Sequence, residues 1–387
     1  MVPVKYNVRN LVVRRATTVA AAFGLALVVL VIAGAQMAVN GLEKTFGRGA
    51  SSDVAIILRK GSDAELPSGI EDKNVSMVVA AAQQVGATKK PMSVGEVVVV
   101  ILLDKLGADG VSNVTVRGTP EDGLAFRPTM KVIEGRAAAT GADEVIIGKQ
   151  IRGRFQGMEL GQSFELKKNR KVKVVGVFED QGSAYESEVF VDLHVLRQTF
   201  AREGYVSSVR VRLDSASKFD AFKANVESNR QLGLVVMRES DFFEKQSEGT
   251  GFLLKFIGYM VGVFFAIAAV IGATITMNAQ VAGRTREIGT LRALGFSRLS
   301  ILFSFLLESV VLSLIGGGVG AIAALGLGFI KVTLINFSSW SEIVWSFEPT
   351  PKILISSVIL AGFMGIIGGF LPAIRAARIS PIEAMRG

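Results

Sequence analysis

The stretch GRTREIGTLRALGFSR (residues 283–298) separates two long apolar runs, and this separation decides the fold class. It contains four arginines and a glutamate, whereas residues 256–283 carry no charge before Arg284 and residues 299–330 carry only Glu308. A short basic segment between long apolar runs is typical of a loop at a membrane surface. The flanking runs therefore predict membrane-spanning helices.

Two more uncharged runs, residues 16–39 and 353–374, complete the pattern. A bilayer core about 30 Å thick needs roughly 20 helical residues at about 1.5 Å each, so all four runs can span it. Residues 16–39 also resemble a secretory signal, but they exceed the roughly 7 to 15 apolar residues of a signal sequence, which favours an uncleaved helix. We predict membrane helices at residues 16–39, 254–281, 300–330 and 353–374.

The net charge of +9 belongs entirely to the membrane part. Residues 39–250 hold 29 basic and 29 acidic side chains, and the remaining residues hold 14 basic and 5 acidic ones. This distribution argues against nucleic-acid binding and places the basic excess at the ends of the predicted helices. By the positive-inside rule, we expect three cytoplasmic segments, at residues 1–15, 283–298 and 375–387.

The same rule places residues 40–250 and the loop 332–351 outside, because that loop contains no lysine or arginine. The loop holds the only tryptophans, Trp340 and Trp345, which we expect to be interfacial anchors. The expected location is the inner (plasma) membrane, with several spans, both termini cytoplasmic and the large domain periplasmic or extracytoplasmic.

The outer segment predicts a mixed α/β domain. Strand patterns lie at residues 97–103, 113–118, 144–148, 163–179, 187–193 and 207–213, and the longest predicts a hairpin around Asn169 and Arg170. Helix patterns lie at 192–200 and 215–229, the latter with Phe219, Phe222 and Val226 on one face. From Glu239 the helical pattern runs without proline into the second span, which predicts a continuous stalk. The fold class is thus an α-helical membrane protein with four transmembrane helices and a mixed α/β extracytoplasmic domain between helices 1 and 2, for which we favour two lobes.

Motifs for catalysis are missing from the sequence. It has no phosphate-binding G-x-x-x-x-G-K-[ST] motif and no G-x-S-x-G nucleophile motif, and it contains no cysteine. His194, the single histidine, has no neighbouring ligand pattern, so we expect a capping or solvated role. Glu308 is the one acidic residue at membrane depth, and a structural role at the interface or beside Ser or Thr is favoured over proton coupling. We expect no enzyme activity, no cofactor and no metal in this chain.

Glycines recur at four-residue spacing in three predicted spans, where they permit close approach of helices. Glycine is also common in membrane helices generally, so for any one pair packing and chance are equally weighted. The candidate packing positions are Gly258, Gly262, Gly316, Gly320, Gly365 and Gly369.

Residues 284–298 can form an amphipathic helix on the inner membrane surface, with Ile288, Leu291 and Leu294 on one face and the arginines beside lipid phosphates. The simplest interpretation is a positive-inside loop. The alternative is a rigid cytoplasmic handle through which another protein moves the second and third spans.

The sequence at this point resembles a known family. RTREIGTLRALGFSRLSILFSFLLESVVLSLIGGGVG, from residue 284, and GGFLPAIRAARISPIEAMRG, at residues 368–387, are similar to the permease signature of MacB/FtsX-type ABC transporters. VIEGRAAATGADEVIIGKQI (132–151) and KVKVVGVFED (171–180) resemble the MacB-type periplasmic core. The two cytoplasmic motifs are specific together and weak apart.

The resemblance implies a four-helix permease that works as a homodimer with two copies of a separate ABC ATPase, which binds the ATP and Mg²⁺. It also implies movement of the periplasmic domain driven by ATP hydrolysis, which is mechanotransmission. The implied ATPase-coupling residues are Arg284, Glu287, Ile288, Gly289, Arg292, Ala293, Gly295 and Ser297. A second cytoplasmic element would include Pro372, Arg375, Arg378, Pro381 and Glu383.

Three uses of such a machine remain open. The first is export of a periplasmic substrate with an adaptor and an outer-membrane channel, the second is release of lipoproteins from the membrane, and the third is FtsX-like regulation of a cell-wall hydrolase without transport. The length of the outer domain, about 210 residues, and its MacB-like motifs favour export. A membrane-anchored sensor or adhesin does not account for residues 283–298.

Overall fold

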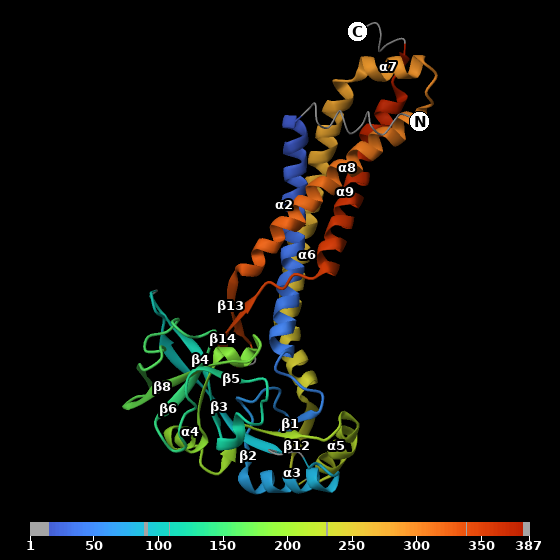
Figure 1. Ribbon diagram of the computed structural model, residues 1–387. Coiled ribbons are helices and arrows are strands. Elements are labelled where there is room, and N and C mark those ends of the chain that lie inside the picture. Colours follow the sequence, from blue (N-terminus) through green and yellow to red (C-terminus); the bar gives the residue numbers. More distant parts are fainter. Residues whose placement is uncertain (1–14, 89–91, 108, 230, 338, 382–387) are drawn as a thin grey trace. The chain divides into compact units, whose positions relative to one another are not determined.

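The computed structural model describes residues 15–88, 92–107, 109–229, 231–337 and 339–381 (Figure 1). It divides into a helical unit and an α/β unit. The helical unit contains the described residues up to Asn40 together with Leu253–Ile330 and those from Ser346 onward. The α/β unit contains Gly41–Phe252 and Lys331–Trp345.

The helical unit confirms the four predicted spans. They lie in α2 (Arg15–Gly47), α6 (Glu239–Ala282), α8 (Arg298–Leu325) and α9 (Pro351–Arg378). Each is long and apolar enough to cross a membrane. A shorter helix, α7 (Thr285–Ala293), separates α6 from α8, and a 3₁₀ turn (Gly326–Phe329) follows α8.

The helices of this unit pack through glycines. A Cβ atom added at five of the six candidate glycines would lie closer than 3.0 Å to a neighbouring helix, and one added at Gly262 would lie 3.2 Å from Ile32. The close contacts join Gly258 of α6 to Ala35, Gly316 and Gly320 of α8 to Ala22 and Ala26 of α2, and Gly365 and Gly369 of α9 to Ser313 and Ser309 of α8. At these positions larger side chains would separate the helices. The Ser309 hydroxyl also donates to the carbonyl of Gly365 at 2.7 Å.

The α/β unit is built on a ten-stranded sheet in the order β12-β1-β11-β3-β4-β9-β6-β8-β5, with β7 paired to β8. Its strands are β1 (Val54–Arg59), β3 (Ser93–Asp104), β4 (Val111–Thr119), β5 (Lys131–Gly135), β6 (Glu144–Gly148), β7 (Ser163–Lys167), β8 (Arg170–Glu179), β9 (Glu188–Asp192), β11 (Ser208–Arg212) and β12 (Leu234–Arg238). Two short pairs lie outside it, β2 (Ile70–Glu71) with β10 (Tyr205–Val206), and β13 (Lys331–Asn336) with β14 (Ser341–Ser346).

Strand β3 joins two parts of the sheet. Its residues 93–96 pair with β11, and its residues 97–104 pair with β4. Val97, Val99, Ile101 and Leu103 alternate onto one face and enter a core that extends through both parts of the sheet. The two parts correspond to the two expected lobes, but they share this core.

Helices α3 (Asp72–Gln84), α4 (Leu193–Phe200) and α5 (Phe219–Ser228) lie wholly within this unit. Asp192 caps α4, because its carboxylate accepts hydrogen bonds from the backbone N–H groups of His194 and Val195. Helix α5 buries Phe219, Phe222 and Val226, which confirms the predicted face.

Several details differ from the sequence predictions. Strands β1, β2, β5, β10 and β12 and helix α3 were not predicted, since their short or weakly periodic sequences give little signal. The turn between β7 and β8 lies at Lys168 and Asn169, one residue earlier than expected, and Asn169 takes the left-handed φ of 67°. Asparagine tolerates this conformation better than most residues.

Most of the predicted outer loop 332–351 forms a β-hairpin, β13 with β14, and Lys331–Trp345 group with the α/β unit. Trp345 lies in β14 with only 4% of its surface exposed, so the expectation that it is a lipid anchor is wrong. Trp340, between the strands, is 60% exposed. The local sequence around Trp345 does not show that this side chain is buried.

Candidate functional site

The segment 283–298 folds as a turn, a helix and a second turn between α6 and α8. Helix α7 ends before Gly295, which has a φ of 92°, a conformation that favours glycine. Ser297 then caps α8, since its hydroxyl accepts a hydrogen bond from the backbone N–H of Ser300. We call residues 283–298 the coupling segment, after the role that the family resemblance predicts for it.

One face of α7 is anchored in the helical unit. Ile288 is 1% exposed and packs in a cluster with buried side chains of α6, α8 and α9: Met277, Val281, Ile301, Phe305, Ala373 and Ala376. Gly289 beside it is also buried. Because α7 contacts three spanning helices, it is held as part of the helical unit.

Arg284 and Glu308 form a buried ion pair. Arg284 Nη1 lies 2.8 Å from Glu308 Oε2, and each side chain is 4% exposed. The Arg284 guanidinium also lies 5.6 Å from the ring centroid of Phe305. Two expectations are therefore corrected: Glu308 is paired with an arginine of the coupling segment, and Arg284 is enclosed by protein where lipid phosphates were expected. Arg284 and Glu308 are 24 residues apart in the sequence, so no local sequence pattern indicates that they pair.

The other face of α7 is exposed. Glu287, Ala293, Gly295 and Ser297 are exposed, whereas Arg292 is half-buried and donates from Nη1 to the carbonyl of Phe296 at 3.2 Å. Leu294, which sequence reasoning placed on the apolar face, is 73% exposed. The segment thus presents a surface of mixed charge with one large apolar side chain.

The predicted second cytoplasmic element begins in the last turns of α9. Pro372 is buried within the helix, Arg375 and Arg378 are exposed, and Pro381 is half-buried. Arg375 Nη1 lies 3.2 Å from Asn278 Oδ1 of α6. Glu383 lies outside the described residues.

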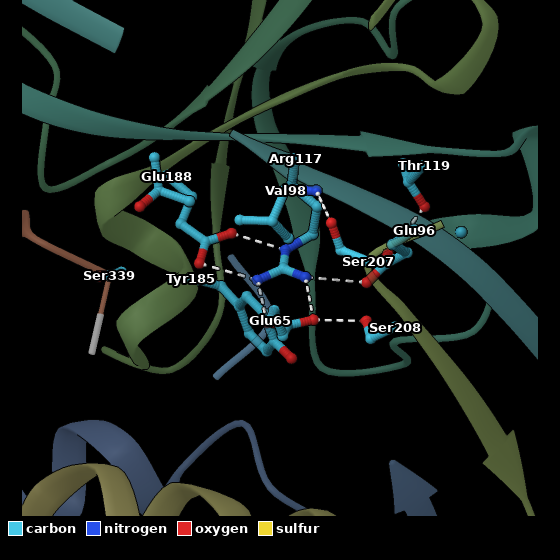
Figure 2. Close-up of polar contacts among 12 residues, drawn as sticks. Glu65, Glu96, Val98, Arg117, Thr119, Tyr185, Glu188, Ser207, Ser208 and Ser339 are labelled. Carbon is cyan, nitrogen blue, oxygen red and sulfur yellow. Dashed lines mark hydrogen bonds and ion pairs between the residues drawn. The ribbon is translucent and has the colours of Figure 1, made fainter. Parts of the chain in front are cut away.

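The α/β unit contains a buried charged group that the sequence analysis missed (Figure 2). We call it the ion cluster, and it consists of Glu65, Glu96, Arg117, Arg127, Glu188, Arg210 and Glu239. The three arginines are 0% to 6% exposed. The cluster lies on the face of the sheet opposite the apolar core, because Glu96, Arg117 and Arg210 alternate with core valines along their strands.

Each arginine of the ion cluster contacts more than one group. Arg117 contacts Glu188 at 2.7 Å and Glu65 at 2.9 Å, and Arg210 contacts Glu65 at 2.8 Å and Glu239 at 3.0 Å. The ring of Tyr185 lies beneath the arginines, and the closest guanidinium carbon is 4.8 Å from its centroid. These contacts link β3, β4, β9 and β11 to Glu239, the first residue of α6.

The protonation states within the cluster are uneven. Burial raises the pKa of Glu96, but Arg127, Arg117 and Arg210 outweigh it and lower that pKa from 4.5 to about 2. Burial likewise opposes the charge of Glu65, yet Arg117 and Arg210 hold its pKa well below the ordinary value. At Glu188 burial prevails over Arg117, so its pKa is raised. Of these three glutamates, Glu188 is the one whose charge the cluster stabilises least.

Neither site has the arrangement of a metal centre. Among the residues that the structure describes, no group of three or more His, Cys, Asp or Glu side chains could hold a metal ion. Each carboxylate of the ion cluster is instead satisfied by arginine.

The architecture defines a class of protein: a multi-span membrane subunit with a large extracytoplasmic α/β domain and a packed helical turn between its second and third spans. Residues 16–229 match the MacB-like periplasmic core domain, and residues 259–381 match the FtsX-like permease C-terminal domain. The chain belongs to the MacB/FtsX-type family of ABC transporter permeases.

Individual relatives are more distant. The ABC transporter permease YknZ of Bacillus subtilis (strain 168) is 31% identical over 208 residues, which cover 52% of this chain and 49% of YknZ. The macrolide export ATP-binding/permease protein MacB of Hahella chejuensis (strain KCTC 2396) is 36% identical over 146 residues, covering 38% of this chain and 21% of that protein. The chain thus matches about half or less of the length of these relatives.

The crystal structure of the periplasmic region of MacB from Actinobacillus actinomycetemcomitans is also similar to part of the chain. It matches with 13% identity and a TM-score of 0.39, and the match covers 51% of this chain and 94% of that structure.

Proposed function

We propose that this chain is the permease subunit of an ABC transporter complex in which a separate ATPase moves the extracytoplasmic domain. In this proposal the ATPase binds ATP and Mg²⁺, and the permease itself has no catalytic activity. Two permease copies and two ATPase copies form the complex. Both termini and the coupling segment face the cytoplasm, as the positive-inside rule indicates.

The observation that carries this proposal is the unbroken course of α6. It is one helix of 44 residues, from Glu239 at the ion cluster to Ala282 at the coupling segment. Gly249 and Gly251, which could have interrupted it, lie within the helix. A continuous helix transmits displacement along its axis, whereas a flexible Gly/Ser linker would absorb it.

The coupling segment supports the other part of the proposal, in which the ATPase binds the permease. Its inner face packs against three spans through Ile288, so a force on α7 acts on the helical unit rather than on a loose loop. Its outer face offers Glu287, Ala293 and the exposed Leu294 to a partner. An apolar side chain that becomes buried when the partner binds, with polar contacts around it, is the usual energetic centre of a protein interface.

We propose export of a periplasmic substrate, with an adaptor and an outer-membrane channel, as the use of this movement. The match of residues 16–229 to the MacB-like periplasmic core supports this choice over two alternatives. These alternatives are release of lipoproteins and non-transporting control of a cell-wall hydrolase.

Deletion of the gene followed by growth under drug, detergent or cell-wall stress tests this choice. Drug sensitivity favours export, and a cell-wall defect alone favours control of a hydrolase.

The coupling segment is tested by Leu294→Glu in the full-length permease co-expressed with its ATPase. We expect this variant to fold but to lose at least about tenfold in ATPase binding, because a charge replaces an apolar anchor. Leu102→Glu is the matched control, since Leu102 is 66% exposed in the α/β unit and Leu294 is 73% exposed.

Co-purification and permease-dependent ATP hydrolysis are the measurements. A charge-reversed variant, Glu287→Arg with Arg292→Glu, tests the same surface by electrostatics. If Leu294→Glu and the charge-reversed variant both retain ATPase binding and hydrolysis, the coupling segment does not bind the ATPase.

A further inference from the structure

The hairpin β13–β14 connects α8 to α9 in the sequence, yet it belongs to the α/β unit. Among the residues that the structure describes, it forms a two-stranded sheet of its own, with no strand ladder to the ten-stranded sheet. Its attachment therefore depends on side chains and isolated backbone groups. These contacts identify a third connection between the spans and the α/β unit, in addition to α2 and α6.

Glu342 is the centre of this attachment. Its side chain is 5% exposed and lies 2.7 Å from both Lys105 Nζ and Arg154 Nη2. The Ser112 hydroxyl also donates to it. Burial alone would raise the pKa of Glu342, but the bonds from Lys105 and Ser112 and the charge of Arg154 lower it, so the carboxylate is charged at neutral pH.

Other contacts fix the hairpin beside Glu342. The Thr115 hydroxyl of β4 donates to the Ser341 hydroxyl at 2.7 Å, and the Asn113 amide donates to the carbonyl of Trp340 at 2.6 Å. The backbone N–H of Val344 donates to the Ser187 hydroxyl at 3.1 Å. Ile343, Val344 and Trp345 are 4% to 7% exposed, so release of the hairpin would expose apolar surface as well as charge.

A small cavity of about 40 Å³ lies under the hairpin. Three members of the ion cluster line it, Glu65, Arg117 and Glu188. Phe46 near the end of α2 and Phe243 and Gln246 of α6 also line it. A cavity of this size holds only about one to three water molecules, so the hairpin is packed closely against its neighbours. The segments that continue into α2, α6, α8 and α9 thus meet at one place in the α/β unit.

We infer that the hairpin is a rigid arm that stays attached to β4 throughout the working cycle, and that Glu342 is the positioning residue that holds it there. The inference deepens the proposed function and rests on it for the direction of movement. Displacement of α8 and α9 then reaches β4, and through β4 the ion cluster, without relying on α6 alone. The hairpin binds the sheet of the same chain, and a buried carboxylate, Glu342, between two cationic side chains holds it there.

The test uses the absence of cysteine from the chain. Thr115→Cys with Ser341→Cys places two thiols where two hydroxyls now lie 2.7 Å apart, a separation compatible with a disulfide. In the complex with its ATPase, the oxidised double-cysteine variant should retain coupled ATP hydrolysis within about twofold. Loss of hydrolysis that a reductant restores would show that the hairpin must detach, and would overturn the inference.

Glu342→Gln gives the complementary result. We expect about tenfold faster amide hydrogen exchange in residues 331–346 and a matching fall in coupled hydrolysis, because Lys105 and Arg154 lose their counter-charge. Glu165→Gln, an exposed position on β7, is the control and should change neither. The disulfide introduced into Glu342→Gln should restore both properties if Glu342 acts by holding the hairpin.

Each outcome of the rescue experiment decides the matter. Restored exchange and restored hydrolysis support a positioning role, whereas slow exchange without restored hydrolysis means that Glu342 acts in another way. Unchanged exchange in Glu342→Gln shows that it does not hold the hairpin. Hydrogen exchange and disulfide formation are measured in the permease alone, so they remain informative if the ATPase does not bind and the proposed function fails.

Discussion

The ion cluster predicts unequal effects for one substitution at two buried glutamates. Glu96 is fully buried, and among the described residues it is the carboxylate that pairs with Arg127, at 2.7 Å. Glu96→Gln therefore leaves the Arg127 guanidinium, itself 6% exposed, without its counter-charge. Glu188→Gln removes one partner of Arg117, which still contacts Glu65 at 2.9 Å.

The magnitude follows from the pKa of Glu96. Its fall from 4.5 to about 2 in the folded protein corresponds to about 3 kcal/mol of preference for the charged carboxylate. Removing one member of a buried ion pair costs a similar amount, about 3 to 5 kcal/mol. We expect Glu96→Gln to destabilise the sheet by about 3 kcal/mol at neutral pH. Glu188→Gln should cost less than about 1 kcal/mol, because the raised pKa of Glu188 means that its charge is disfavoured.

The pH dependence of the two glutamates has opposite sign. The folded pKa of Glu96 lies below its ordinary value, so its contribution is present above about pH 4.5 and is lost as the pH falls towards 2. The folded pKa of Glu188 is raised, so its contribution is present at low pH and is lost as the pH rises through that raised pKa. Acidification should therefore weaken the wild type more steeply than Glu96→Gln.

Native-state hydrogen exchange of β3 and β4 in the intact protein measures these effects, because a single unfolding free energy is ill-defined for a chain with two units. A loss of about 3 kcal/mol corresponds to exchange more than about a hundredfold faster. If Glu188→Gln accelerates exchange as much as Glu96→Gln, or if neither does, the account of the ion cluster is wrong.

Two further predictions concern the helical unit. Gly320→Ala should destabilise the detergent-solubilised protein by about 1 to 3 kcal/mol, because its new Cβ would overlap the carbonyl of Ala26. Gly318→Ala is the control, because a Cβ at this position on the same helix meets nothing within 4 Å and should be neutral. Equal melting temperatures of the two variants would contradict this packing. Arg284→Gln and Glu308→Gln should each destabilise the protein by about 3 kcal/mol, because each leaves the other charge of the pair buried without its partner. The double variant should recover much of that loss, because both charges of the pair are gone. Additive losses in the melting temperature would contradict the ion pair.

The elements with strong sequence patterns could be predicted from the sequence. The four spans follow from uncharged runs long enough to cross a bilayer, and β3 follows from its valine-rich run. The turn conformation at Gly295 agrees with the presence of glycine after α7. Strands β1 (VAIILR) and β12 (LVVMR) were missed, because a short apolar run without alternation cannot be told from a buried helix segment by periodicity alone.

The ion cluster was missed for a different reason. The alternating pattern SVRVR at residues 208–212 correctly indicates a strand with one apolar and one polar face. A polar face is ordinarily assigned to solvent, yet Arg210 is 0% exposed. Its burial depends on Glu65, Glu96 and Glu239, which lie far from it in the sequence and supply the opposite charge.

What the amino-acid sequence determined by itself is the presence of the four spans and the class of each major segment, because hydrophobic length and strand periodicity are local properties. Only the tertiary structure decided which charges pair, that Glu308 faces Arg284, and that residues 331–346 attach to the sheet through Glu342. Buried ion pairs and hairpin docking join residues that are distant in the chain, and their free energy depends on exclusion of water by the assembled fold.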